Sequence, residues 1–210
     1  MREPGRIIPP EPPIVAADDP RATVFKNRGA LLALPAVALA TLGKPSAFSI
    51  AVGLPVAFAG EAIRCWAVGY SGATTRADHV TVQHLTTAGP YAYVRNPLYV
   101  GNFLTALGFG IAFTGALPRE RRKLLIGAGL ATMASVYSTI VPLEESYLER
   151  KFGREYVEYR AAVPQWIPKC SPVQETKGTY DVSTIAKAES RTFLTFGVML
   201  LALAAKALKK

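Results

Sequence analysis

Apolar residues gather into five windows along the chain, separated by polar stretches. The windows cover 29–43, 45–60, 98–118, 124–143 and 192–205, and charged residues are almost absent from them. About 20 apolar residues are needed to cross a bilayer as a helix, so the third and fourth windows are long enough on their own. The pattern predicts an all-α fold, a multi-pass transmembrane helical bundle of about five spans.

The other windows are shorter and leave alternatives open. Window 45–60 reaches full length only if its helix continues through Glu61 and Arg64 to about Tyr70. These two charges lie three residues apart on one helical face, so they can pair with each other or face a polar cavity. Window 29–43 fits a short span, a buried helix or half of a hairpin with the next window.

A first motif block lies directly before the third window. It covers residues 89–99, with the sequence GPYAYVRNPLY. Asn96 is a favoured N-cap and Pro97 suits the first helical position, so a spanning helix is expected to begin there. Helix-start N–H groups beside Arg95 would make an anion site, and the tyrosines of the block offer aromatic faces. An aromatic and basic belt at a membrane interface would use the same residue types.

A second motif block follows the fourth window. It starts with Glu144 and Glu145, which can bind an amino group or accept a proton, or can be ordinary solvated charges at the interface. Further along, apolar residues recur at helical spacing, and these are Leu148, Phe152, Tyr156 and Tyr159. The opposite face is charged, which predicts an amphipathic helix on the membrane surface. A stripe that packs on a protein core would look the same, and Gly153 is expected to bend or split the helix.

The charge distribution suggests an orientation. The chain carries 24 Lys and Arg and a net charge of +9, which juxtamembrane contacts with anionic lipids explain without a nucleic-acid partner. In a five-span arrangement only eight of the 24 fall on the side opposite the two blocks. The positive-inside rule therefore places both blocks in the cytoplasm, at a bacterial inner membrane or the endoplasmic reticulum, although the dense 119–123 loop favours the reverse.

The remaining segments add little chemistry. Residues 1–27 are rich in proline and charge, lack a signal-peptide core and are expected to be a disordered arm. The membrane core is expected over 28–170, and 171–210 would be a polar linker followed by a hydrophobic helix. Cys65 and Cys170 have no metal-ligand spacing to a histidine, so no metal site is predicted. Nothing in the chain indicates an oligomeric state.

Together the two blocks resemble the integral-membrane methyltransferases related to isoprenylcysteine carboxyl methyltransferase and the phospholipid methyltransferases. The resemblance covers about Gly60 to Pro168. It implies a helical enzyme that moves a methyl group from S-adenosylmethionine to a lipophilic acceptor. Carried over by position, the cofactor-binding residues are Gln83, Leu85, Gly89, Pro90, Tyr91, Asn96, Pro97, Leu98, Tyr99 and Glu144. Glu145 is the expected base, and Arg95 is the expected catalytic neighbour.

The chain departs from the family pattern at three positions. Asn96 stands where relatives commonly carry histidine, and an amide cannot titrate. Gln83 also replaces a histidine. Ile140 stands where the carboxyl methyltransferases place an arginine that holds the substrate carboxylate. This departure favours an amine, a hydroxyl or another lipophile over a prenylcysteine carboxylate as the methyl acceptor. The competing interpretation is a non-catalytic, lipid-binding or assembly membrane protein on the same scaffold.

Overall fold

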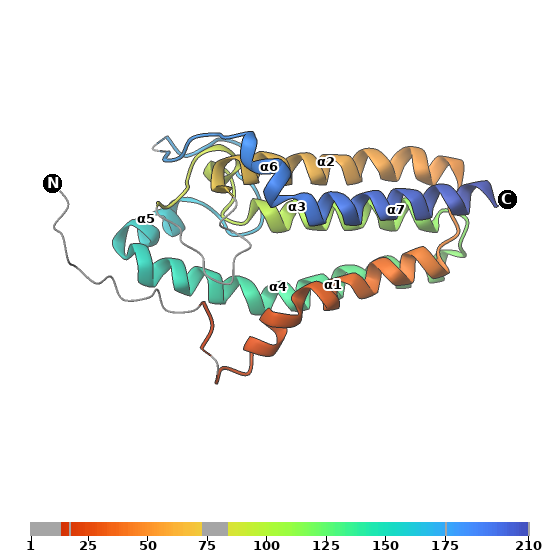
Figure 1. Cartoon of the computed structure of the whole chain (residues 1–210), viewed down its shortest axis with the longest axis horizontal. Helices are drawn as coiled ribbons and strands as arrows, with labels where there is room; N and C mark the ends of the chain where they lie inside the picture. The colour runs from red at the N-terminus through yellow and green to blue at the C-terminus, as the bar shows by residue number, and fades with distance from the viewer. Residues whose placement is uncertain (1–13, 17, 73–83, 175, 210) are drawn as a thin grey trace.

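The chain folds as a bundle of helices (Figure 1). The computed structural model describes residues 14–16, 18–72, 84–174 and 176–209, and this part of the chain contains helices and no strand. The helices are α1 (Ala22–Leu42), α2 (Ala47–Ser71), η2 (Gly89–Ala92), α3 (Pro97–Thr114), α4 (Arg119–Phe152), α5 (Arg154–Ala162), α6 (Ser183–Ala188) and α7 (Ser190–Leu208). The predicted all-α fold is confirmed.

Four of the helices are long and apolar enough to cross a membrane, namely α2, α3, α4 and α7. The fifth predicted span corresponds to α1, which is not among the four, because Lys26 and Arg28 lower the hydropathy of its first turns. The second window does continue through Glu61 and Arg64, as its length required. The described residues therefore form a multi-pass bundle with four candidate spans instead of about five.

Helices α2 and α3 approach each other backbone to backbone through glycine. A Cβ atom on Gly60 would lie 2.6 Å from the carbonyl oxygen of Gly101. A Cβ atom on Gly108, two turns further along α3, would lie 2.3 Å from the backbone nitrogen of Ala57. Small residues at this spacing let two helices pack closely. Gly101 and Gly108 are thus used for helix packing, and they bring α2 against the first motif block.

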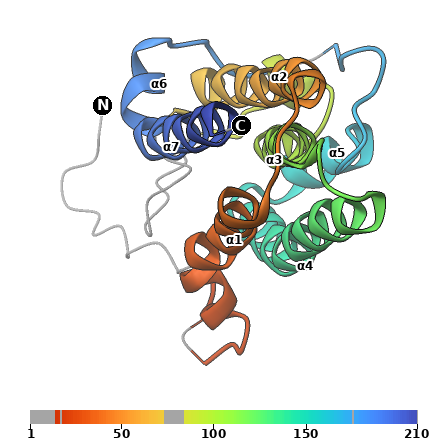
Figure 2. The ribbon, with the colours of Figure 1, turned by 90° about the vertical axis from the view of Figure 1, so that its right-hand side faces the viewer.

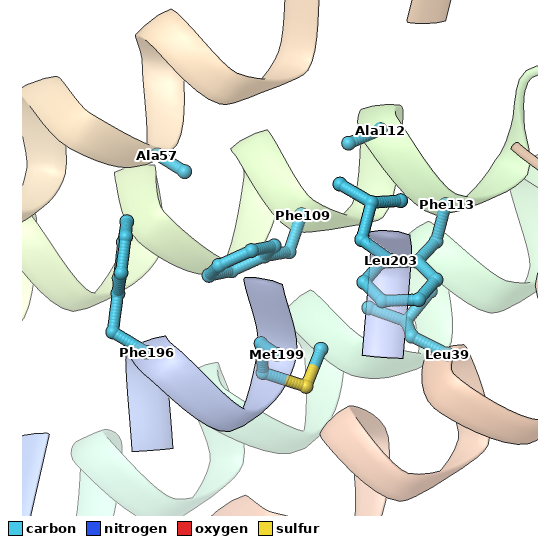
Figure 3. Packing of buried hydrophobic residues seen from close by; sticks show 8 residues of the cluster. All are labelled: Leu39, Ala57, Phe109, Ala112, Phe113, Phe196, Met199 and Leu203. Carbon is cyan, nitrogen blue, oxygen red and sulfur yellow. The ribbon is translucent and has the colours of Figure 1, made fainter. Parts of the chain in front are cut away.

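Helix α3 lies at the centre of the bundle when the molecule is seen end on (Figure 2), with the other long helices around it. One buried cluster joins α1, α2, α3 and α7 (Figure 3). Its members are Leu39, Ala57, Phe109, Ala112, Phe113, Phe196, Met199 and Leu203. The last apolar window therefore forms a helix that packs into the core of the bundle.

The two ends of the bundle differ. At one end lies α5 (Figure 1), and at the other the short connections before α2 and α4 lie beside the C-terminal turn of α7. There Lys206 Nζ donates hydrogen bonds to the carbonyl oxygens of Thr41 and Gly43, 2.9 and 3.0 Å away. The chain reverses direction at Gly153, whose φ of +54° ends α4 and starts α5, so the predicted amphipathic helix is split there.

Candidate functional site

The first motif block forms a turn that leads into α3. Residues 89–92 make the helix η2, and α3 begins at Pro97 with Asn96 at the N-cap position, as predicted. The predicted capping role of the Asn96 side chain is wrong. Its Nδ2 donates instead to Oε1 of Glu145 and to the carbonyl oxygen of Gln165, both at 3.3 Å. Asn96 therefore ties the first block to the second.

Arg95 makes the same connection more strongly. Its Nε and Nη2 donate to the two carboxylate oxygens of Glu145, at 2.9 and 3.2 Å. Its Nη1 donates to the carbonyl oxygens of Val163 and Arg160, at 2.7 and 3.1 Å. A two-pronged pair between guanidinium and carboxylate fixes both groups in direction as well as distance. The structure thus uses Arg95 and Glu145 to hold the two blocks together.

Glu144 faces a different partner. The hydroxyl of Tyr99 donates to its carboxylate, with both oxygens within 2.9 Å. The ring of Tyr99 lies 4.4 Å from that of Tyr137, centroid to centroid. These two rings, named here the tyrosine pair, link the carboxylate to the middle of the bundle.

The two blocks enclose a cavity of about 120 Å³, which we call the polar pocket. It is lined by Ser71, Leu85, Thr86, Tyr91, Arg95, Asn96, Glu144, Glu145, Leu148, Tyr156 and Tyr159. Six of the predicted site residues are brought together in this lining. Gly89, Pro90, Pro97, Leu98 and Tyr99 lie in the elements that frame the pocket without lining it, and Gln83 lies outside the described residues.

Five residues of the lining were not among the predicted site residues. Leu148, Tyr156 and Tyr159 belong to the apolar stripe of the second block, whose spacing predicted a surface helix or a core-packing face but not a pocket wall. Ser71 and Thr86 gave no signal in the sequence, because an isolated hydroxyl residue belongs to no recognisable motif or spacing. The hydroxyl of Tyr159 donates to the carbonyl oxygen of Tyr91 at 2.9 Å, which fixes α5 on η2.

Three tyrosines of the polar pocket stay neutral at physiological pH. Burial raises the pKa of Tyr91 to about 12. It also raises the pKa of Tyr156 and Tyr159 well above the ordinary tyrosine value. These groups can donate hydrogen bonds and offer ring faces, but they do not act as bases near neutral pH.

A second, larger cavity of about 210 Å³ lies inside the bundle between α1, α3, α4 and α7, with Glu61 of α2 at its edge. We call it the apolar chamber. Its walls are mostly aliphatic and aromatic, including Leu39, Phe109 and Met199. Polar groups that face it are Glu61, Asn102, Thr105, Tyr137, Thr192 and Thr195. The side chain of Asn102 points into the bundle, where its Nδ2 donates to the hydroxyl of Tyr137 at 2.8 Å.

The tyrosine pair stands between the two cavities. Tyr137 lines the apolar chamber, and Tyr99 holds Glu144, which lines the polar pocket. Two aromatic rings and one carboxylate thus connect the wall of one cavity with the wall of the other. Ile140 lies one turn from Tyr137, fully buried among apolar side chains, so its position supplies no charge to either cavity.

Arg64 lies near the chamber with a partner that the sequence did not reveal. The predicted contact with Glu61 exists, at 3.9 Å between Nε and Oε2. The closer partner is Glu189, 2.7 Å away and fully buried. Residues 171–191 were expected to be a polar linker, and this expectation is wrong for Glu189. A charge pair separated by 125 residues leaves no local pattern.

Comparison with known proteins places the chain among membrane methyltransferases. A protein S-isoprenylcysteine O-methyltransferase of Schizosaccharomyces pombe is 37% identical over 97 residues, which are 43% of this chain and 34% of that protein. The cobalt-zinc-cadmium resistance protein CzcN of Cupriavidus metallidurans is 34% identical over 119 residues, 55% of this chain and 51% of the relative.

A probable protein-S-isoprenylcysteine O-methyltransferase of Oryza sativa subsp. indica is 33% identical over 121 residues, 56% of this chain and 60% of the relative. The chain thus spans between about a third and three fifths of the length of these relatives. No solved structure matches. The model of the phospholipid methyltransferase family matches residues 48–155, which hold α2, α3, α4 and the two motif blocks up to the start of α5. The chain therefore belongs to the phospholipid methyltransferase family.

Proposed function

We propose that the chain transfers a methyl group from S-adenosylmethionine to a lipophilic acceptor at the cytoplasmic face of a membrane. The observation that carries this proposal is the meeting of two unlike cavities at the tyrosine pair. One is polar and lined by both motif blocks, and the other is apolar and enclosed by helices. A charged donor and a lipophilic acceptor need such different surroundings within reach of each other.

The chemistry of the polar pocket fits the donor. Glu144 suits its amino group and positive sulfur, and the rings of Tyr91, Tyr156 and Tyr159 suit its adenine. Arg95 lines the same pocket and adds a positive charge that favours its carboxylate, although the nitrogens of Arg95 already donate to Glu145, Arg160 and Val163. The pocket is smaller than the roughly 300 Å³ common for such ligands, so binding requires it to widen. S-adenosylmethionine supplies a methyl group on a positively charged sulfur.

We assign different roles to the two glutamates. Glu145 is committed to Arg95 through both oxygens and serves mainly to hold the blocks in position, although it was the base expected from the sequence. Glu144, reached through Tyr99, is closer to the chamber side and is the better proton acceptor for an acceptor amine or hydroxyl. Positioning of donor and acceptor in a water-poor site supplies most of the rate enhancement, because the acceptor atom, the methyl group and the sulfur must lie in line.

Titration calorimetry of the full chain in detergent tests the donor site. We expect S-adenosylmethionine to bind, and Glu144→Gln to weaken binding at least about tenfold because a charge-assisted contact is lost. Glu158→Gln is the matched control, since this carboxylate lies on α5, exposed and paired with Arg154. Binding that is equal in all three proteins contradicts the proposed pocket.

The transfer itself is tested with a donor that carries a radiolabelled methyl group and a total lipid extract. Label in a lipophilic product, absent in Glu144→Gln and present in Glu158→Gln, is the expected result. A protein that binds lipid but neither binds the donor nor labels any lipid would be the non-catalytic membrane protein instead.

A further inference from the structure

The C-terminal tail brings a buried carboxylate to the polar end of the apolar chamber. Glu189 is fully buried, and both its oxygens accept from Nη2 of Arg64, at 2.9 and 2.7 Å. Thr192, one turn later, lies 3.3 Å from the same nitrogen and lines the chamber. Both residues lie beyond position 155, where the family match ends. The tail thus adds to the chamber a feature that the matched core does not contain.

The terminal nitrogens of Arg64 are engaged from inside the protein. Nη1 donates to Oδ1 of Asn102 and to the carbonyl oxygen of Leu98, and Nη2 donates to Glu189. A ligand carboxylate in a membrane interior needs a cation with donors to spare. Glu189 therefore occupies Nη2 of Arg64 through both its oxygens, while Nε has no hydrogen-bond partner among the described residues and lies 3.9 Å from Glu61.

Glu61 sets the sign of the charge on the chamber wall. Among the described residues that line the chamber it is the one with a charge, and it is 7% exposed. Arg64 lies 3.9 Å from Glu61 and 2.7 Å from Glu189, so one guanidinium is shared between two carboxylates. This group keeps a negative formal charge, which attracts a cationic head group and repels carboxylate or phosphate. The aliphatic and aromatic walls beyond it suit a hydrocarbon chain.

We propose that the apolar chamber binds a single-chain lipophilic amine, with its nitrogen at Glu61 and its chain along α7, and that Glu189 excludes carboxylate heads by occupying Arg64. That this amine is the methyl acceptor rests on the proposed function, whereas its binding stands on the chamber alone. For the transfer the nitrogen leaves Glu61 and moves along the tyrosine pair to Glu144, to which the ammonium gives one proton. The freed lone pair then forms the N–C bond while the electrons of the broken C–S bond stay on sulfur.

Photo-crosslinking tests the chamber without the methyl donor. The full chain in detergent is incubated with decyl probes that carry a diazirine on the chain and an amine, alcohol or carboxylate head, and labelled peptides are mapped by mass spectrometry. We expect the amine probe to label α7 about tenfold more than the carboxylate probe. Met199→Trp, which fills the chamber, should abolish this labelling.

Three substitutions assign the roles of the carboxylates. Glu61→Gln should lower amine labelling about tenfold. Glu189→Gln should raise carboxylate labelling severalfold, because Arg64 regains donors. Glu120→Gln is the matched control, since that exposed carboxylate pairs with Lys123 at the far end of the bundle. If a glutamine variant fails to fold, the comparison of head groups and Met199→Trp still decide the result.

Two outcomes overturn the inference. One is carboxylate or alcohol labelling of α7 in the unmodified protein that equals amine labelling, and the other is labelling that survives Met199→Trp. Donor binding, measured separately, distinguishes the two proposals. Methylation of a carboxylate or alcohol lipid removes only the amine specificity, whereas chamber labelling by the amine without donor binding removes only the proposed function.

Discussion

Glu144 and Glu145 are neighbours in the chain that serve different parts of the site. Successive residues of a helix point about 100° apart, so one faces Tyr99 and the other faces Arg95. The sequence identified both carboxylates as site residues because they sit together at the end of an apolar window. It could not assign their partners, because those lie about 45 to 50 residues away along the chain.

At Tyr91 the contributions of the ring and of the hydroxyl to ligand binding can be measured separately. Tyr91→Ala should weaken binding of S-adenosylmethionine roughly tenfold through loss of a stacking face, and Tyr91→Phe should keep most of the affinity. The measurement is calorimetry at several pH values. Binding that weakens equally in both variants would show that the hydroxyl, not the ring, makes the contact.

The difference in stability between the wild type and Tyr91→Phe should depend on pH in a defined way. Because the pKa of Tyr91 is raised from 10.0 to about 12 in the folded protein, its stabilising effect is complete below pH 10 and declines between pH 10 and 12. The difference in unfolding temperature between wild type and Tyr91→Phe should therefore stay constant from pH 6 to 9 and shift against the wild type only above pH 10. A change near neutral pH would contradict this assignment.

At the scale of elements, the contact between α2 and α3 positions the site. The first motif block leads directly into α3, and Arg64 and Glu61 lie on α2, so the spacing of these two helices sets the distance between the polar pocket and the chamber. Glycines at the crossing let the backbones touch. A larger residue there would separate the two cavities as well as loosen the bundle.

Gly108→Ala tests this crossing. The new Cβ would lie 2.3 Å from a backbone atom that cannot turn away, so we expect the free energy of unfolding to fall by about 1–3 kcal/mol. Gly127→Ala, on α4 with no atom near its Cβ position, should instead gain up to about 1 kcal/mol from helix propensity. Thermal unfolding in detergent measures both, and equal effects would argue against a close crossing.

The elements that local rules specify were predictable from the sequence. The start of α3 at Pro97 and the break at Gly153 both follow from the preferences of one or a few adjacent residues. The position of α7 against the chamber and the pairing of Glu189 with Arg64 do not. They depend on how distant apolar faces pack, and a polar stretch with one buried glutamate looks like any other linker.

At the scale of the whole molecule, the polar pocket and the short connections before α2 and α4 lie at opposite ends of the bundle. Cys170 is exposed and belongs to the pocket end, because the adjacent Lys169 donates its backbone N–H to the carbonyl oxygen of Tyr93. This natural thiol can therefore report on which side of the membrane the pocket faces.

A membrane-impermeant maleimide applied to cells that carry the Cys65→Ser variant should leave Cys170 unlabelled until the membrane is opened. This result follows from the proposed cytoplasmic orientation, in which most basic residues lie on the pocket side. In a variant that also lacks Cys170, Lys44→Cys at the opposite end should be labelled in intact cells. The reverse pattern would mean that the 119–123 loop determines the orientation.

The tyrosine pair also has an evolutionary consequence. On its one side lies the polar pocket, built mainly from residues inside the family match, and on its other side lies a chamber that α7, from outside the match, helps to line. Mutations in the tail can therefore change what the chamber accepts while the polar pocket stays intact. A gene duplicate with a new tail would keep the inherited pocket and gain a different chamber, so one ancestral core can give rise to paralogues with different ligands.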